Sequence, residues 1–401
     1  MPQPIRILEL RSVLGTGGGP EKTILLGSAM ADPSRYAITV CYIRDLRDPV
    51  FGIDARAAEL GLDYVEVRER HSFDFTIWPR LRQLVRKRRI DIVHSHDYKT
   101  NLYAWLLGRH ERVIPLATLH GYTGHSWREM LYYAADKRVV RRFPLTVAVS
   151  GDLRQELIRT GSDPSRVIRV LNGIDDRAFF RQPSLRPSAR EALGVPGDAI
   201  VVGAVGRLER QKRFELLMEA FAVLRERLPH LTLRLVIAGD GSLRTRLEQR
   251  RDELGLKDSC LLAGHRGDVA LLHHAFDVFV QSSDYEGTPN AVLEAMAFET
   301  PLVATDVGGT RELVDHQRHG LIIAPGQVST LAEAIGQVIA DPDGARARAK
   351  AARSRVETEL SFRTRMATIE TLYDRLMSGR ANPTSSRHED DDTRVAAARV
   401  Q

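Results

Sequence analysis

Short apolar runs alternate with helix-length segments along most of the chain. The first series lies at 5–10, 38–43, 63–68, 90–96, 114–121, 145–150 and 167–173. A second series follows at 199–207, 233–240, 260–265, 278–283, 302–306 and 320–324. Alternation of strands and helices is typical of βαβ units, in which helices cover both faces of a parallel sheet. The sequence therefore predicts an α/β protein with two Rossmann-like, doubly wound parallel sheets.

The two series are separated by residues 175–198, which are rich in proline and arginine and show no clean periodicity. We place the domain junction there, with a first domain over 1–177 and a second over 198–360. Helices are expected around 328–358 and 361–378. The remaining residues, 379–401, are polar, charged and poor in aromatics, and we expect them to be disordered.

Composition narrows the class of protein. No apolar run approaches the length of a membrane span, and the chain enters its first strand without a secretory signal, so we expect an intracellular location. Cys41 and Cys260 fall inside predicted strands and are expected to be buried thiols. Lys plus Arg number 58 against 52 Asp plus Glu, a net charge of +6 that is spread along the chain.

Basic segments lack the interleaved aromatic residues of a nucleic-acid platform, so no nucleic-acid partner is expected. Residues 126–143 are an exception, because they combine Trp127, Tyr132, Tyr133 and Phe143 with basic side chains. This composition is compatible with contact to an anionic membrane surface. A packed amphipathic helix is the simpler interpretation.

A glycine-rich loop, LGTGGGPEK (14–22), follows the first predicted strand and opens a helix. Free amides and the helix dipole favour an anion at such a place, and glycines permit close backbone approach. We therefore expect Gly17, Gly18 and Gly19 to contact phosphates. Pro20 stands where a dinucleotide-binding motif would need its third glycine, which disfavours a dehydrogenase even though Asp45 could imitate the ribose-binding acid.

The segment GRLERQK (206–212) ends a predicted strand and supplies Arg207 and Lys212. A guanidinium fork and a point charge together suit a diphosphate. The alternative is that both are ordinary surface cations of an arginine-rich protein.

The segment EGTPNAVLE (286–294) carries two carboxylates around a turn. Proline is favoured at the first helical position, so we expect Pro289 to begin a helix. Glu286 should then precede this helix, and Glu294 should lie about one turn inside it. Gly287 and Thr288 would let the backbone turn, and the amides around Asn290 and Ala291 would donate to hydroxyl or phosphate oxygens. We therefore expect the binding site to include Gly287, Thr288, Pro289, Asn290 and Ala291. The alternative is that both glutamates are ordinary charges at a helix start.

These motifs, together with LHG (119–121), NGID (172–175), AGDG (238–241) and VGG (307–309), resemble the signatures of glycosyltransferase family 4, the retaining GT-B enzymes. The resemblance extends to about residue 378 and is specific around the glutamate pair. In the first domain it is loose beyond the glycine loop and LHG. It implies a GT-B fold, in which two Rossmann-like domains face a central cleft and the helix at 361–378 crosses back onto the first domain. Met366, Ile369, Leu372 and Tyr373 have the apolar spacing for that packing.

The resemblance also implies roles for residues. Arg207 and Lys212 would stabilise the departing diphosphate of a nucleotide-sugar, Glu294 would hold the ribose, and Glu286 would bind hydroxyls of the donor sugar. His120 would reach that sugar from the first domain. The glycine loop would close over the donor, while His265 and Arg266 would flank the base.

The chemistry that the resemblance implies is front-face attack, in which the leaving phosphate oxygen accepts the acceptor's proton. No protein nucleophile, metal or cofactor is implied, since the nucleotide-sugar is a substrate. The acidic run EDDD (389–392) lies in the expected tail. The chain departs from the family pattern at Arg213 and Glu299, where glycine is common.

A UDP- or GDP-linked donor and a glycan or polyprenyl-linked sugar acceptor are expected. Residues 94–105 and 120–130 should line the acceptor side. Such enzymes commonly build surface polysaccharides or glycolipids, so we expect a cytoplasmic protein that can contact the inner face of the plasma membrane peripherally. Two alternatives stay open: a nucleotide-sugar epimerase of the same fold, and a non-catalytic scaffold that binds nucleotide-sugars.

Overall fold

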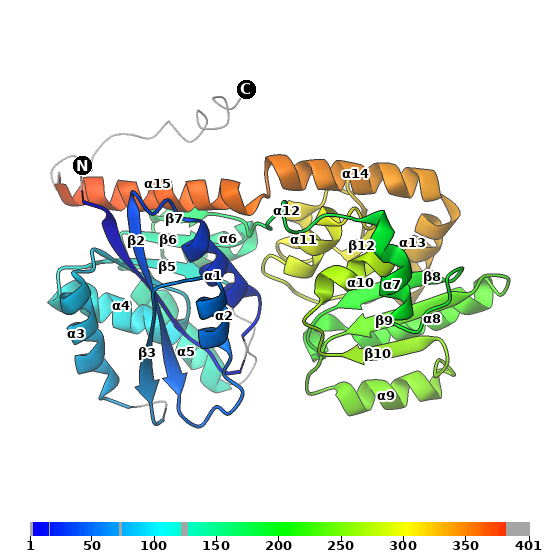
Figure 1. Cartoon of the computed structure of the whole chain (residues 1–401), viewed down its shortest axis with the longest axis horizontal. Coiled ribbons are helices and arrows are strands. Elements are labelled where there is room, and N and C mark those ends of the chain that lie inside the picture. The colour runs from blue at the N-terminus through cyan, green and yellow to red at the C-terminus, as the bar shows by residue number, and fades with distance from the viewer. Residues whose placement is uncertain (1–2, 16, 72–73, 122–126, 382–401) are drawn as a thin grey trace.

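Two parallel β-sheets form the centres of two domains that lie side by side in Figure 1. The computed structural model describes residues 3–15, 17–71, 74–121 and 127–381. In sheet order, the first sheet contains β3 (Tyr64–Glu69), β2 (Tyr36–Asp45), β1 (Ile5–Ser12), β4 (Ile92–Ser95), β5 (Ile114–Leu119), β6 (Leu145–Ala148) and β7 (Val167–Arg169). The second contains β10 (Cys260–Gly264), β9 (Leu233–Ala238), β8 (Ile200–Val205), β11 (Val278–Gln281), β12 (Leu302–Thr305) and β13 (Leu321–Ile323). The paired strands are parallel, and the predicted fold class is confirmed.

Helices cover both faces of each sheet. Those of the first domain are α1 (Gly19–Met30), α2 (Ile53–Glu59), α3 (Ile77–Arg88), α4 (Tyr98–His110), α5 (Trp127–Val140) and α6 (Gly151–Arg159). The later helices are α7 (Arg186–Glu191), α8 (Phe214–Arg227), α9 (Arg244–Glu253), α10 (Val269–Ala275), α11 (Asn290–Ala297), α12 (Thr310–Leu313), α13 (Val328–Ala340), α14 (Pro342–Thr358) and α15 (Phe362–Ala381). Short 3₁₀ turns occur at η1 (Pro164–Arg166), η2 (Pro183–Leu185) and η3 (Arg210–Lys212).

The strand order of each sheet reverses once, between β1 and β4 in the first and between β8 and β11 in the second. Ligands of doubly wound sheets bind outside the carboxyl ends of the strands at such a point. The glycine loop follows β1, and the segment with Arg207 and Lys212 follows β8. The segment with Glu286 and Glu294 follows β11. The topology therefore places three of the sequence motifs at the two switch points.

The last two helices run along one edge of both domains, α14 over the second and α15 over the first (Figure 1). Residues Phe362, Met366, Ile369, Leu372, Tyr373 and Leu376 of α15 are buried in a core with strand residues that include Ile7, Ile92 and Leu116. A bridge between Ile174 and Ser361 joins the chain where it leaves and re-enters the first domain. The C-terminal helix is therefore part of the first domain's core.

The segment between the two sheets is partly helical. Ala189, Leu193 and Val195, in and after α7, are buried in a core of the second domain together with Val201 and Phe276. Helix α15 continues to Ala381, so residues 379–381, which we expected in the tail, are helical. The rest of that expected tail, 382–401 with the acidic run EDDD, lies outside the described residues.

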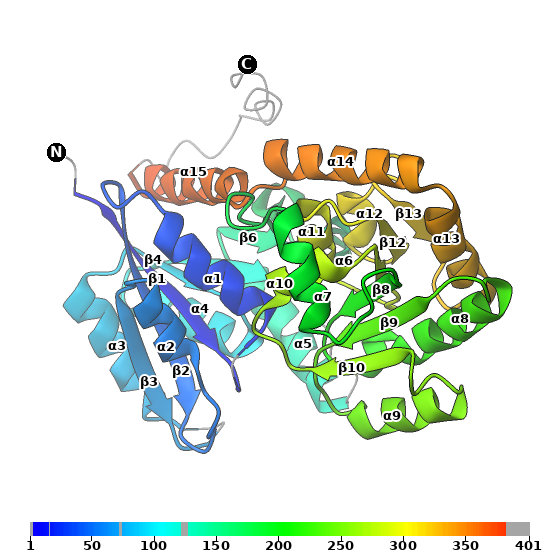
Figure 2. The ribbon, with the colours of Figure 1, turned by 45° about the vertical axis from the view of Figure 1, so that its right-hand side comes forward.

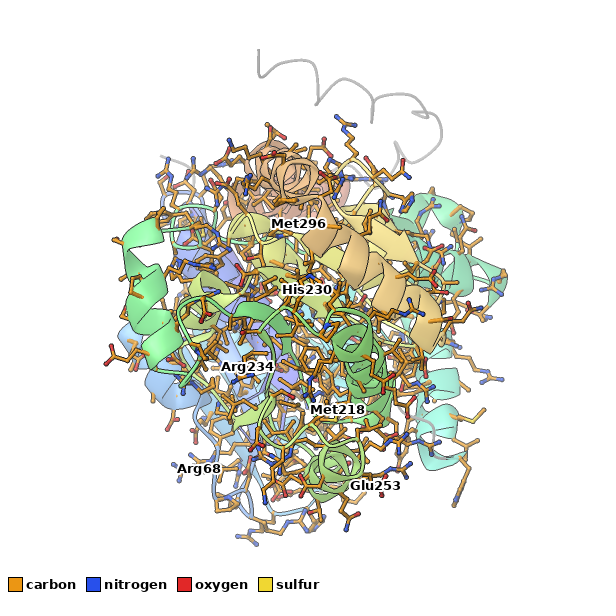
Figure 3. The ribbon with its side chains drawn as sticks, turned by 90° about the vertical axis from the view of Figure 1, so that its right-hand side faces the viewer. Arg68, Met218, His230, Arg234, Glu253 and Met296 are labelled. Atoms are coloured by element: carbon orange, nitrogen blue, oxygen red, sulfur yellow. The ribbon has the colours of Figure 1, made fainter. Side chains whose placement is uncertain are left out.

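The interiors of both domains are apolar. Cys41 and Cys260 are free and buried, as expected, and burial raises the pKa of each thiol to about 12. Figure 3 looks onto the second domain, in which the labelled Met218 and Met296 are fully buried, one in each of two core clusters. These cores hold the loops at the strand ends in place.

Candidate active site

The segment EGTPNAVLE connects β11 to α11. Helix α11 begins at Asn290, and Pro289 is its N-cap with φ −74° and ψ 108°. The expectation that Pro289 is the first helical residue was therefore wrong by one position, because its ψ is still extended. Glu286 precedes the helix and Glu294 lies about one turn inside it, as predicted. The amides of Asn290 and Ala291 belong to the first helical turn, where the helix itself supplies no acceptors.

Glu286 and Lys212 form an ion pair between the loop after β11 and the turn η3. Lys212 Nζ donates to Glu286 Oε1 at 2.5 Å, and Ser283 Oγ donates to the same oxygen at 2.6 Å. Among the residues that the structure describes, the other oxygen, Oε2, has only a 3.5 Å contact with Gln211 Nε2. Glu286 thus keeps one carboxylate oxygen with acceptor capacity to spare.

Arg207 follows β8 in the same region. Its side chain is exposed and makes no ion pair within the described ranges. Tyr285 lies close enough for Arg207 to lower its pKa, although burial acts more strongly and raises that pKa overall. Arg207 is therefore a cation near Glu286 that has not been neutralised by a described carboxylate.

Glu294 pairs with a residue of the other domain. Its carboxylate is 5% exposed, and Oε1 accepts from Lys22 Nζ at 3.0 Å. Lys22 lies in the first turn of α1, so this contact joins the starts of α1 and α11 across the domain boundary (Figure 2). Lys22 was not predicted as a site residue, although it stands in the segment PEK directly after the glycine loop.

The glycine loop turns tightly onto its own helix. Gly17 has φ +71°, and a Cβ there would collide with Glu21. Gly18 N donates to Glu21 Oε2 at 2.5 Å, while Arg11 Nε donates to Glu21 Oε1 at 2.5 Å. Burial acts to raise the pKa of Glu21, but the charge of Arg11 and the hydrogen bonds from Gly18 and Arg11 together outweigh it and lower the pKa. A buried ion pair that the sequence analysis missed therefore shapes this loop.

The loop also faces the second domain. A Cβ on Gly19 would stand 2.6 Å from Asn290 Nδ2. Gly19 is thus next to the N-terminus of α11, and the expected phosphate contacts of Gly17, Gly18 and Gly19 stay a prediction. Thr16, between the glycines, lies outside the described residues.

His120 meets the second domain at Gly287. A Cβ on Gly287 would stand 2.8 Å from the His120 carbonyl oxygen, so this contact leaves no room for a larger residue. Thr288 Oγ1 donates to the carbonyl of Val149, and Gly309 N donates to the carbonyl of Gly287 at 2.7 Å. The turn before α11 is therefore held from both domains.

Asn172 of the NGID segment adds a further contact. Its Nδ2 donates to Thr288 O at 3.4 Å and to Asn290 Oδ1 at 3.3 Å. No role was predicted for Asn172, because a pairing across 118 positions of sequence leaves no local signal.

His265 and Arg266 follow β10. His265 is exposed, whereas Arg266 forms a two-pronged ion pair with Asp268 at 2.8 and 2.6 Å. No described contact joins either residue to Glu286 or Glu294. Their expected role beside the base stays a prediction.

The two departures from the family pattern share a backbone feature. Arg213 and Glu299 have φ +52° and +50°, in the left-handed region that favours glycine. Arg213 precedes α8, and Glu299 follows α11. Both residues thus have the left-handed backbone conformation that glycine adopts easily, although each carries a long side chain.

Glu9, His94 and His96 form a buried cluster under the site. One ligand atom from each lies within 4.8 Å of the others, which is close enough for a shared metal ion. This cluster was not predicted from the sequence, since Glu9 and the histidines come from different strands.

Comparisons with known proteins match both halves of the chain. Residues 186–355 match the family described as "Glycosyl transferases group 1", and residues 21–178 match "Glycosyltransferase Family 4". The chain belongs to these glycosyltransferases. The two matches fall on the second and first domains, and they confirm the resemblance drawn from the motifs.

Individual glycosyltransferases match over much of the chain. A glycogen synthase of Mycobacterium tuberculosis strain H37Rv is 29% identical over 370 residues, covering 88% of this chain and 84% of that protein. An Escherichia coli UDP-Gal:alpha-D-GlcNAc-diphosphoundecaprenol alpha-1,3-galactosyltransferase is 26% identical over 300 residues, covering 73% and 77%. The chain spans less than two thirds of the length of three further relatives, at 66, 64 and 63%.

Solved glycosyltransferase structures share the fold. The crystal structure of Anabaena Alr3699/HepE in complex with UDP-glucose has a TM-score of 0.81 at 21% identity, over 94% of this chain and 100% of that chain. The likeness confirms the GT-B architecture.

Proposed function

We propose that this glycosyltransferase moves a sugar from a UDP- or GDP-linked donor to a glycan or lipid-linked glycan, with retention of anomeric configuration. The observation that carries the proposal is the meeting of α1 and α11. There the glycine loop, Lys22 and Glu294 from the two domains face each other beside the Lys212–Glu286 pair. This arrangement offers amides and cations to a diphosphate and carboxylates to hydroxyls.

Lys212 and Arg207 would stabilise the negative charge that grows on the leaving diphosphate. The leaving phosphate oxygen would accept the acceptor hydroxyl's proton while that hydroxyl attacks from the same face. The free capacity of Glu286 Oε2 suits a hydroxyl of the donor sugar. Glu294 would exchange its contact with Lys22 for the ribose hydroxyls.

A cavity in the first domain supports a lipid-linked acceptor. It has a volume of about 870 Å³, opens beside the residues that precede the glycine loop, and is lined by aromatic and aliphatic residues of α3, α4 and α5 such as Trp78, Leu102, Tyr103 and Tyr132. Acidic residues that line the cavity pair with neighbouring side chains. Glu69 forms an ion pair with Lys99, and Asp136 accepts a hydrogen bond from Asn101.

The surface next to this cavity supports peripheral membrane contact. Trp127, Met130 and Leu131 of α5 are exposed. None of the described helices is both long and apolar enough to cross a bilayer. We propose that this face of α5 rests on the inner leaflet while the acceptor's lipid enters the cavity.

A donor and acceptor screen tests the function. The protein would be incubated with UDP- and GDP-sugars, with polyprenyl-linked and soluble glycan acceptors, and the products identified by mass spectrometry and by the anomeric coupling in NMR spectra. We expect an α-linked product from an α-linked donor. We also expect activity to survive excess EDTA, because the site supplies its own cations.

Other outcomes would contradict specific parts of the proposal. An inverted product would refute retention, and loss in EDTA that magnesium restores would refute metal independence. Transfer only to soluble glycans would refute the lipid-linked acceptor. An epimerised free donor would instead indicate an epimerase, and donor binding without turnover would indicate a scaffold.

A further inference from the structure

A polar cluster lies on the face of the first sheet that α15 covers. Side chains two positions apart on a strand share a face, so Glu9 follows Ile7, His94 follows Ile92 and Thr118 follows Leu116 on this side. Ile7, Ile92 and Leu116 belong to the core with α15. Along each of these strands, this face of the sheet is therefore apolar first and polar near the carboxyl end, which faces the cleft. The polar members of the cluster are Glu9, His94, His96, Thr118, His120 and, from α15, Tyr373.

Glu9 is the acceptor at the centre of this cluster. Its Oε1 accepts from the Tyr373 hydroxyl at 2.8 Å, and its Oε2 lies 2.5 Å from His96 Nε2. Burial acts to raise the pKa of Glu9, but His94 and His96 outweigh it and hold the pKa well below its usual range. An ionised carboxylate can only accept, so His96 must carry a proton on Nε2.

The proton position on His96 determines the direction of the next hydrogen bond, between His96 and His120. Burial, reinforced by His94, lowers the pKa of His96 to about 4, so this imidazole is neutral near pH 7 and its Nδ1 bears no proton. His96 Nδ1 lies 3.3 Å from His120 Nε2, and the two ring planes are inclined by 26° with their centroids 5.6 Å apart. His120 Nε2 must therefore donate. Burial and then Arg11 lower the pKa of His120, so its Nδ1 is left as a bare acceptor.

His120 Nδ1 is buried and has no hydrogen-bond partner in the described part of the chain. The residue lies against Gly287, in the turn that Glu286 begins. A buried acceptor without a partner is costly, and a sugar hydroxyl is a donor of the right chemistry to pair with it.

We propose that Glu9 and His96 are positioning residues, which hold His120 as the Nε2–H tautomer so that its Nδ1 accepts a hydrogen bond from a hydroxyl of the transferred sugar. Tyr373 orients Glu9 from α15, so the helix that closes the first domain also supports the site. The tautomer of His120 is inferred from the contacts of the cluster. Only the identification of its partner as a sugar hydroxyl rests on the proposed function.

A metal ion bound by Glu9, His94 and His96 would be a different use of the same side chains. The Tyr373 hydroxyl lies 2.9 Å from His94 Nδ1 and also donates to Glu9 Oε1. The atoms that would bind a metal ion therefore already have hydrogen-bond partners. We therefore favour the hydrogen-bonded chain. Elemental analysis of the purified protein tests this choice, and a stoichiometric divalent metal lost in Glu9→Gln would overturn the proposal.

The first experiment observes the tautomer without any activity assay. In long-range ¹H–¹⁵N spectra of protein labelled at histidine nitrogens, we expect His120 to show a protonated Nε2 and a bare Nδ1; His120→Gln assigns its signals. In His96→Phe the His120 signals should shift toward a mixture of tautomers. A proton on His120 Nδ1 in the wild type, or unchanged His120 signals in His96→Phe, would overturn the proposal.

The second experiment is a double-mutant cycle with the full donor. His96→Phe and His120→Phe should each lower kcat about tenfold, the value of one oriented hydrogen bond, and the double variant should lose no more than either single one. His96→Gln keeps a donor and an acceptor and should recover part of the rate. If the double variant instead loses kcat by the product of the two single losses, His96 does not act through His120.

Thr118→Val is the matched control. Thr118 Oγ1 bonds His94 Nε2 at 2.7 Å, so this variant removes an equally buried hydrogen bond of the cluster but not the branch to His120. It should lower stability while leaving kcat near the wild-type value and the His120 tautomer unchanged. An equal loss of kcat in Thr118→Val would mean that the cluster is only structural. If the wild type transfers no sugar, the proposed function fails, and the spectra still decide the tautomer.

Discussion

Lys212 and Glu286 illustrate how single residues of this site depend on each other. Their 2.5 Å pair keeps the lysine beside the expected diphosphate and orients the carboxylate toward the expected sugar. Removing either member leaves a partly buried charge without its partner, so variants must be read with the partner in mind.

Lys212→Ala should lower kcat by a factor on the order of 100 or more, because charge stabilisation of the leaving group is worth several kcal/mol. Steady-state kinetics with saturating donor measures the effect. Arg210→Ala, an exposed cation in the same turn, is the control and should behave as the wild type. Wild-type turnover in Lys212→Ala would contradict the role in leaving-group stabilisation.

Glu294→Gln and Glu286→Gln should impair different steps, nucleotide binding in the first and turnover in the second. The first should weaken binding of the free nucleoside diphosphate by roughly 1–3 kcal/mol, for a charged hydrogen bond lost. The second should leave that binding nearly intact and lower turnover, since its partner is the sugar. Calorimetry with the nucleotide and initial rates with the donor measure both.

Lys22→Ala is the control for this pair, because it removes the 3.0 Å contact of Glu294 without removing the carboxylate. Because Lys22 is also a cation near the expected diphosphate, the double variant Lys22→Ala with Glu294→Gln completes the test. If the double variant binds the nucleotide no more weakly than Lys22→Ala alone, the carboxylate acts through the domain contact and not on the ribose.

Glu299→Gly should stabilise the protein by about 1 kcal/mol, because a left-handed residue after a helix is strained unless it is glycine. Glu299 has φ +50° directly after α11 and its cap. Urea denaturation measures the change. Glu299→Ala keeps the strain and removes the same carboxylate, so an equal gain there would assign the effect to charge.

At the scale of elements, α15 connects stability with the site. Its apolar side chains complete one core of the first domain, and Tyr373 reaches Glu9 beneath the cleft. Damage to this helix should therefore affect the first domain before the second.

Ile369→Ala should destabilise the first domain by about 2–4 kcal/mol, because the side chain is fully buried and its removal leaves a cavity. Hydrogen exchange measured by mass spectrometry should show the loss in β1, β4 and β5, with β8 and β9 unchanged. Thr368→Ala, an exposed neighbour, should change neither region. Equal loss of protection in both domains would mean that they unfold as one unit.

At the scale of the whole molecule, buried neutral histidines set the response to acid. Burial is the first cause that lowers the pKa of His96 to about 4 and of His273 to about 3. The folded-state values lie below the ordinary value of about 6.5, so the unfolded state binds protons first as the pH falls. The free energy of unfolding should therefore decrease from about pH 6.5 toward pH 4.

His273→Phe should reduce this loss of stability in acid. Both ring nitrogens of His273 are buried without a hydrogen-bond partner in the described part of the chain, and the ring stacks on Phe298. Urea midpoints at pH 7, 6 and 5 measure the slope. His230→Gln, an exposed histidine labelled in Figure 3, should leave the slope unchanged. An unaltered slope in His273→Phe would show that other groups control the acid response.

The two parallel sheets could be predicted from the sequence, because the period of apolar residues and the spacing of helices are local properties of the chain. The sequence also placed Glu286 before α11 and Glu294 inside it, since turn and helix preferences act over a few residues. The position of Pro289 was wrong by one because a local preference does not set the last ψ before a helix.

Which groups meet in the site could not be predicted from the sequence, because these contacts form only when the whole chain folds. Lys22 and Glu294 are 272 positions apart, and Tyr373 and Glu9 are 364 apart, so no periodicity links them. The tautomer assigned to His120 depends on Glu9 and His96, which reach it across neighbouring strands. Such contacts arise from the order of strands at the switch points and from the return of α15, both of which depend on packing of the whole chain.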